Sequence, residues 1–219
     1  MIRRGYRARQ RILSDDELRT VWRVAAEHKG PFDFLVQFIL LTAARRCEAS
    51  DMTRREVQGA DWIIEAPRYK TGSPQLVPLS ARAQCLLAWV PKLDGCPFVF
   101  TTDGERPMSG FSKLKASFDK RVSEANGAPL SRWTLHDLRR TSRTLLSRAG
   151  VSADHAERCI GHVIGGVRGV YDLWQYAEEK RQGFEALATL LDRILHSQAN
   201  VVAPSVACEL PTAPRAVSP

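Results

Sequence analysis

Residues 134–141 have the sequence Thr-Leu-His-Asp-Leu-Arg-Arg-Thr, and this stretch is the most informative part of the chain. His136 and Arg139 are three residues apart, so a helix would place them on one face. Arginine presents a planar pair of donors to phosphate oxygens, and histidine can transfer protons near neutral pH. Further along the chain, His162 precedes Tyr171 by nine residues. Because a tyrosine hydroxyl can be the nucleophile of a covalent intermediate, this order of residues indicates chemistry at a phosphodiester.

Two segments closer to the N-terminus add charged side chains to this set. Arg45 follows an apolar run and precedes Glu48 by three residues. Lys70 lies between two expected strands, in a Lys-Thr-Gly-Ser-Pro sequence that is typical of a turn. Taken alone, Arg45 and Glu48 could form a surface ion pair worth only about 0.3 kcal/mol. A lysine in a turn is also usually solvated, so neither feature is specific by itself.

The whole ordered set resembles the catalytic domain of the tyrosine recombinases, the phage-type integrases. The likeness covers about residues 13–196. No single motif is decisive, but six matching positions in the right order are hard to reach by chance. These positions are Arg45, Lys70, His136, Arg139, His162 and Tyr171.

The resemblance implies a site-specific DNA recombinase that cleaves and rejoins DNA strands. In this family two arginines, here Arg45 and Arg139, grip the nonbridging phosphate oxygens. The tyrosine, here Tyr171, attacks the phosphate, which gives a 3′-phosphotyrosyl link and a free 5′-hydroxyl. A hairpin lysine, here Lys70, protonates the leaving oxygen. The link retains the bond energy, so the resemblance implies neither a cofactor nor a metal.

Other residues of the expected site have supporting or competing roles. By resemblance, His136 and His162 assist by proton transfer or by hydrogen-bonding the phosphate. Glu48 is expected to orient the histidine and the arginine rather than to contact DNA. Three neighbours compete with the chosen residues, and the match to the motif places them second: Arg46, Arg140 and Tyr176.

A zinc site is the alternative interpretation of one segment. His155, Cys159 and His162 are spaced to lie on one helical face. A structural zinc ion normally takes four ligands, and Gly161 is expected to end the helix before His162. We therefore expect no metal here.

Composition agrees with a nucleic-acid partner. The chain has 219 residues, a formal charge of +8 and an isoelectric point near 9.6. Such a balance suits a polyanion, and the resemblance makes that polyanion double-stranded DNA. Five scattered cysteines without a CxxC motif predict reduced thiols and a cytoplasmic protein, and the resemblance implies that this protein associates with the bacterial nucleoid. The longest apolar run, residues 38–44, is too short to span a bilayer.

The periodicity of apolar residues predicts a mainly α fold with a small antiparallel β-hairpin or sheet, an α+β class. Ser14 and Glu17 form a capping box at the start of the first helix, which Lys29-Gly30-Pro31 ends. Strands are expected at residues 62–65 and 76–79. Further helices are expected at residues 32–44, 81–90, 111–125, 135–149, 154–161 and 178–196.

We expect three regions along the chain. Residues 13–196 form the catalytic domain, and the proline-rich residues 197–219 form a disordered tail. Residues 1–12 form a basic arm that contacts the DNA backbone through Arg3, Arg4, Arg7, Arg9 and Arg11.

The resemblance raises one question about activity. Family members normally carry a separate helical DNA-binding domain before the catalytic domain, and only a dozen residues precede Leu13 here. The alternative function is therefore a truncated, non-catalytic DNA-binding remnant of an integrase. A relaxing enzyme like the type IB topoisomerases shares the chemistry, but the chain lacks the large clamp of those proteins.

The last predicted helix has an apolar stripe that must be buried somewhere. It runs through Phe184, Leu187, Ala188, Leu191 and Ile194. In the resembled family the C-terminal segment docks on a neighbouring protomer, and we expect self-association on DNA as a tetramer. We therefore expect this helix to act between subunits. The alternative is that the stripe packs on its own domain.

Overall fold

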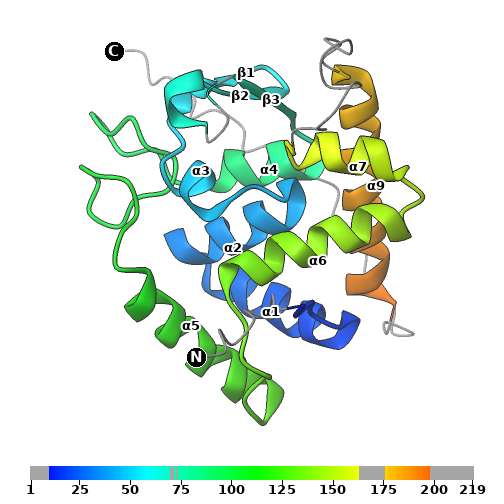
Figure 1. Cartoon of the computed structure of the whole chain (residues 1–219). Coiled ribbons are helices and arrows are strands. Elements are labelled where there is room, and N and C mark those ends of the chain that lie inside the picture. Colours follow the sequence, from blue (N-terminus) through cyan, green and yellow to red (C-terminus); the bar gives the residue numbers. More distant parts are fainter. Residues whose placement is uncertain (1–9, 70–71, 73, 163–175, 198–219) are drawn as a thin grey trace, which may run out of the picture.

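The computed structural model describes residues 10–69, 72, 74–162 and 176–197. Helices dominate, and a small sheet lies at one end of the helical body (Figure 1). In chain order the elements are α1 (Asp15–His28), α2 (Pro31–Thr42), α3 (Arg46–Ser50), β1 (Val57–Gln58), β2 (Asp61–Ile64), β3 (Gln75–Pro78), α4 (Ala81–Trp89), α5 (Phe111–Asn126), α6 (Leu135–Arg148), α7 (Ala153–Cys159) and α9 (Ala177–His196). The predicted fold class is confirmed.

Helix α1 begins as its sequence predicts. Ser14 accepts a hydrogen bond from the Glu17 backbone, and Glu17 accepts one from the Ser14 backbone, so the capping box is complete. This arrangement satisfies two amide groups that a helix start leaves without partners. Leu18 and Val21 are fully buried on its inner face. The helix ends at Lys29, which adopts a left-handed conformation with φ 54°.

Helix α2 is the centre of the core. All but the first of its residues are buried, and it contacts α1, α4, α6 and α9 (Figure 1). Pro31 occupies the first turn, where a missing N–H costs nothing. The helix ends at Ala43, which takes φ 51° and turns the chain toward α3. A non-glycine residue in this conformation is uncommon, and it lies two residues before Arg45.

The sheet has the predicted hairpin and one additional strand. Strands β2 and β3 pair antiparallel, with Trp62 opposite Val77. Trp62 is fully buried and its ring packs 5.4 Å from that of Phe38 in α2, so the hairpin is tied to the central helix. Strand β1 was not predicted because Val57 and Gln58 are too short a run to show an alternating pattern.

Helices α6 and α7 end in the same way. In α6, Gly150 takes φ 87° and the Val151 amide donates to the Leu146 carbonyl. In α7, Gly161 takes φ 65° and the His162 amide donates to the Glu157 carbonyl. Both patterns are Schellman motifs, in which a left-handed glycine follows the helix and satisfies its last carbonyls.

Helix α9 packs on its own domain. Phe184, Leu187 and Leu191 are fully buried, and α9 contacts α1, α2, α6, α7 and β3. The expectation that its apolar stripe acts between subunits is therefore wrong. The stripe was correctly identified as buried, but its burial is provided by the same chain.

The cysteines agree only partly with the expected reduced state. Cys47, Cys96 and Cys159 are free thiols. Cys85 is disulfide-bonded, so the expectation fails at that residue. Within the described ranges, none of the helices is long and apolar enough to cross a membrane.

Candidate active site

The turn between α2 and α3 holds Arg45. Its guanidinium donates to Glu48 Oε1 at 2.5 Å, and its backbone amide donates to Glu48 Oε2 at 2.9 Å. Glu48 is buried, so this pair is not the solvated contact that its spacing alone would allow. Burial by itself would lower the pKa of Arg45, but its hydrogen bonds to Glu48 and Tyr69 raise that pKa above its usual value. Arg45 is therefore a fixed cation.

Arg139 enters the same region from α6. Its side chain is buried, with only 5% of the residue exposed. It donates to the Ala43 carbonyl at 2.6 Å and to the Ile160 carbonyl at 2.7 Å, which are the residues that cap α2 and α7. Burial, together with repulsion from Arg45, lowers the pKa of Arg139 to about 10. Arg139 nevertheless keeps its charge at neutral pH.

Tyr69 connects the pieces of this cluster. Its hydroxyl donates to the Gly161 carbonyl at 2.8 Å and accepts from Arg45 at 3.3 Å. The ring also lies under the Arg45 guanidinium, 5.5 Å from its centre. Burial raises the pKa of Tyr69, so the phenol stays protonated and can donate. Sequence reasoning missed Tyr69, and its position beside Lys70 was the one available signal.

His136 lies in the first turn of α6, one turn before Arg139. The residue is exposed. Partial burial and repulsion from Arg140 and Arg139 lower the pKa of His136. A neutral imidazole at neutral pH can accept a proton.

His162 follows the end of α7 and is half exposed. Its Nδ1 lies 2.5 Å from Glu157 Oε2. Glu157 in turn accepts from Arg143 of α6 at 2.8 Å. The backbone amide of His162 is also bound to Glu157, as described above.

The competing arginines point elsewhere. Arg46 is exposed, with its guanidinium 4.7 Å from the centre of the Phe111 ring. Arg140 pairs at 2.7 Å with Asp137, whose side chain is fully buried. Neither shares a partner with the cluster around Tyr69 among the described contacts.

Several predicted site residues lie outside the described residues, namely Lys70, Tyr171, Arg3, Arg4, Arg7 and Arg9. Arg11 is described, and it forms an ion pair with Glu17 of the α1 capping box. Tyr176, the competitor of Tyr171, precedes α9 and lies under the Arg158 guanidinium, 3.6 Å from its centre.

The described residues contain no group of three or more His, Cys, Asp or Glu side chains that could hold a metal ion. His155, Cys159 and His162 therefore do not form the zinc alternative. Cys159 is buried, and this burial raises the pKa of its thiol to about 12.

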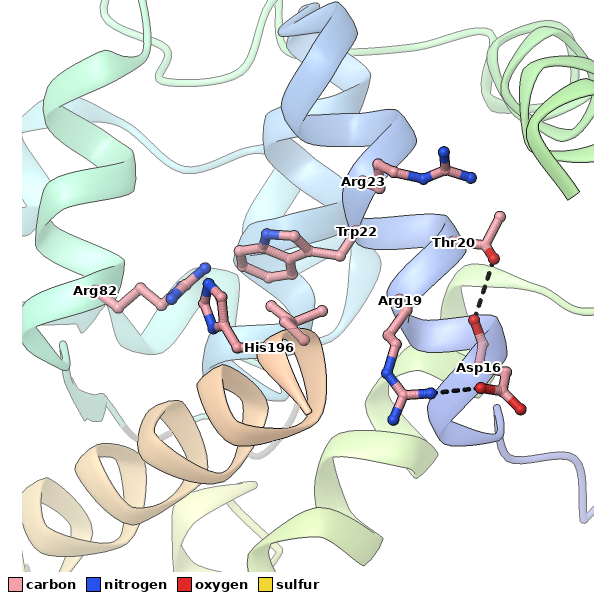
Figure 2. A pocket seen from close by; sticks show the side chains of 8 residues that line it. Asp16, Arg19, Thr20, Trp22, Arg23, Arg82 and His196 are labelled. Atoms are coloured by element: carbon pink, nitrogen blue, oxygen red, sulfur yellow. Dashed lines mark hydrogen bonds and ion pairs between the residues drawn. The ribbon is translucent and has the colours of Figure 1, made fainter. Parts of the chain in front are cut away.

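A hollow of about 480 Å³ lies between α1, α4 and α9, away from Arg45, Tyr69 and Arg139 (Figure 2). Arg19 and Trp22 of α1, Arg82 of α4 and His196 of α9 line it. Arg19 already pairs with Asp16, and Arg82 pairs with Asp192 and covers the Trp22 ring. The arginines of this hollow are therefore occupied by contacts within the protein.

Known proteins with a similar sequence identify the family of this chain. Residues 11–171 match the phage integrase family. The chain belongs to that family. It is also 31% identical, over 175 residues, to the prophage integrase IntZ of Escherichia coli K12. This alignment covers 77% of the chain but only 42% of the relative, so the chain spans less than half the length of that integrase.

Solved structures agree on the fold. The lambda integrase catalytic core matches with a TM-score of 0.56 and 19% identity, over 69% of this chain and 94% of that one. A lambda integrase tetramer bound to a Holliday junction matches with a TM-score of 0.59 and 18% identity, over 74% and 49%. XerH recombinase bound to its difH substrate matches with a TM-score of 0.55 and 16% identity, over 70% and 47%. The described helices and sheet are thus those of a phage-integrase catalytic domain.

Proposed function

We propose that this phage integrase family member is a site-specific DNA recombinase that cleaves and rejoins strands through a 3′-phosphotyrosine on Tyr171. One observation carries the proposal. Two arginines distant in sequence, Arg45 and Arg139, meet at the ends of α2 and α7, where Tyr69 and Glu48 hold Arg45 in place. Fixed cations are what a phosphodiester needs as charge develops on its nonbridging oxygens.

The arginines keep donors available for this task. A guanidinium has five N–H groups. Arg139 donates one from each terminal nitrogen to a carbonyl, which leaves three for a phosphate. Because its two backbone contacts fix the plane of the group, Arg139 needs no reorganisation to bind a charged oxygen.

Proton transfer is assigned to the remaining residues. The Tyr171 oxygen forms a bond to phosphorus as the bond to the 5′-oxygen breaks. His136, whose lowered pKa keeps it neutral, suits acceptance of the tyrosine proton. Lys70 and His162 assist the leaving oxygen, which takes up a proton to become the 5′-hydroxyl. Reversal of the same steps rejoins a strand without hydrolysis of a nucleotide.

The partners follow from the same proposal. We infer that the chain binds double-stranded DNA and self-associates on it, and that it acts in the cytoplasm at the nucleoid. The formal charge of +8 supports the DNA contact, and the lambda integrase structure was solved as a tetramer on a Holliday junction. The Arg-rich residues 1–12 would contact the phosphate backbone as an arm.

A nicked DNA substrate tests this function. When the strand is nicked near the cleavage point, the short product diffuses away and the covalent protein–DNA adduct accumulates. We expect a denaturant-resistant adduct with the unmodified chain and with Tyr176→Phe, and none with Tyr171→Phe. An adduct in Tyr171→Phe would overturn the nucleophile assignment. DNA binding without any adduct would instead favour the non-catalytic remnant.

A further inference from the structure

At the end of α7, both the backbone and the side chain of His162 bind Glu157. The His162 amide donates to the Glu157 carbonyl at 3.0 Å, and the His162 Nδ1 lies 2.5 Å from the Glu157 carboxylate. The backbone bond fixes where the residue leaves the helix. The side-chain bond then fixes the direction of the ring, so both the position and the orientation of His162 depend on Glu157.

The matching end of α6 shows that the side-chain bond is not required to close such a motif. There the same two positions are held by Leu146 and Val151, a buried and a half-buried apolar residue. An apolar pair is what usually accompanies this type of helix end. Helix α7 uses a carboxylate and an imidazole in place of that pair, and it does so next to the cluster that contains Arg139.

Arg143 makes the carboxylate a permanent acceptor. Its Nε donates to Glu157 Oε1 at 2.8 Å, while its Nη1 donates to Ser147 of the same helix at 2.8 Å. Burial alone would raise the pKa of Glu157, but hydrogen bonds from Arg143 and His162 lower it below the usual range. An ionised carboxylate only accepts hydrogen bonds, so the Nδ1 of His162 must carry the proton that it shares.

We propose that Glu157 is a positioning residue for the reaction, which holds His162 with Nδ1 protonated and presents Nε2 to the DNA. This inference rests on the proposed recombinase function. Two helices contribute to this positioning, because Glu157 lies in α7 and His162 follows it, while Arg143 of α6 fixes the carboxylate. Loss of the carboxylate leaves the fold in place but releases the ring from its one set orientation.

Two variants separate the effect of the Glu157 charge from the effect of its side-chain length. Glu157→Gln keeps the length of the side chain and removes the charge, whereas Glu157→Asp keeps the charge and shortens the side chain. Asp15→Asn is the matched control, because Asp15 pairs with Arg148 of α6 at 2.7 and 2.9 Å and has no contact with His162. All three remove or weaken a carboxylate–arginine pair on α6.

The first measurement needs no DNA. Ring nitrogen chemical shifts of His162 in the ¹⁵N-labelled full chain report which nitrogen is protonated. We expect the Nδ1–H form in the unmodified chain and in Asp15→Asn, and a mixture of both forms in Glu157→Gln. Unchanged shifts in Glu157→Gln would overturn the positioning role, since Glu157 would then only join α7 to α6 through its ion pair with Arg143.

The second measurement is the single-turnover rate of adduct formation on nicked DNA. Misplacement of a reacting group by about 1 Å can cost up to roughly 100-fold, so we expect about a 10- to 100-fold loss in Glu157→Gln. Glu157→Asp should recover part of this loss, and Asp15→Asn should keep the full rate. A full rate in Glu157→Gln despite altered shifts would overturn the inference. If the unmodified chain forms no adduct, the recombinase proposal fails, and the nitrogen shifts still decide whether Glu157 orients His162.

Discussion

Replacing Gly161 with alanine should destabilise the protein far more than the same change at Gly150. Both glycines follow a helix in the same motif and both have positive φ, 65° and 87°. They differ in their surroundings. A Cβ at Gly150 would meet nothing within 4 Å, whereas a Cβ at Gly161 would overlap the Tyr69 hydroxyl and come within 3.0 Å of Tyr69 Cζ.

The size of the difference follows from these contacts. The left-handed conformation costs a residue with a Cβ about 1–2 kcal/mol, and this is the whole expected effect in Gly150→Ala. In Gly161→Ala the Tyr69 hydroxyl must also move away. It then gives up its bonds to the Gly161 carbonyl and to Arg45, each worth about 1 kcal/mol net. We therefore expect a total of about 3–4 kcal/mol.

Urea unfolding followed by circular dichroism measures both values. Tyr69→Phe provides the matched test, because it removes the hydroxyl oxygen that a new Cβ would overlap. In the Tyr69→Phe background, the cost of Gly161→Ala should fall to within about 1 kcal/mol of the cost of Gly150→Ala, as expected for coupled neighbours. Equal costs for Gly161→Ala and Gly150→Ala in the unmodified chain would refute the reasoning, since Tyr69 would then not be seated against the end of α7.

Three other outcomes are expected. Arg139→Lys should nearly abolish adduct formation, because a compact ammonium cannot span the Ala43 and Ile160 carbonyls as the planar guanidinium does and still face a phosphate. Arg140→Lys should retain activity. Normal cleavage in Arg139→Lys would make Arg139 structural only. Leu191→Ala should lower the free energy of unfolding by about 2–5 kcal/mol, and the same change at the half-buried Leu190 should lower it clearly less. A chain cut after Ala177 should fail to fold. A stable truncated chain would instead support the hypothesis that this helix docks on a neighbouring subunit. DNA affinity, measured by fluorescence anisotropy, should fall steeply with salt, by about 0.9 in the log–log slope for each phosphate contacted; salt-independent binding would contradict a mainly electrostatic contact.

Local signals in the sequence predicted most of the fold. The Ser14–Glu17 capping box and the Lys29-Gly30-Pro31 break placed α1 and α2 within one or two residues, because each depends on neighbours along the chain. The hairpin was predicted for the same reason. The apolar stripe of α9 showed that this face is buried, but periodicity cannot tell whether the covering surface belongs to the same chain.

Contacts between distant residues explain what the sequence could not show. The order of Arg45, His136, Arg139 and His162 predicted a candidate site, and all four remain candidates by resemblance and geometry. The role of Tyr69 depends on a bond to Gly161, 92 residues away. No pattern along the chain encodes such a pairing, since it exists only after α7 has packed beside the hairpin.

The two carbonyl contacts of Arg139 also limit how relatives can be judged from sequence. Ala43 and Ile160 are the last residues of two helix ends, and Arg139 satisfies a carbonyl at each. Removing the arginine would therefore leave two buried acceptors unpaired, at a cost of about 1–3 kcal/mol each. A family member that did not recombine DNA would still be under selection to keep Arg139 in order to fold. Retention of that arginine is thus poor evidence that a related chain is active.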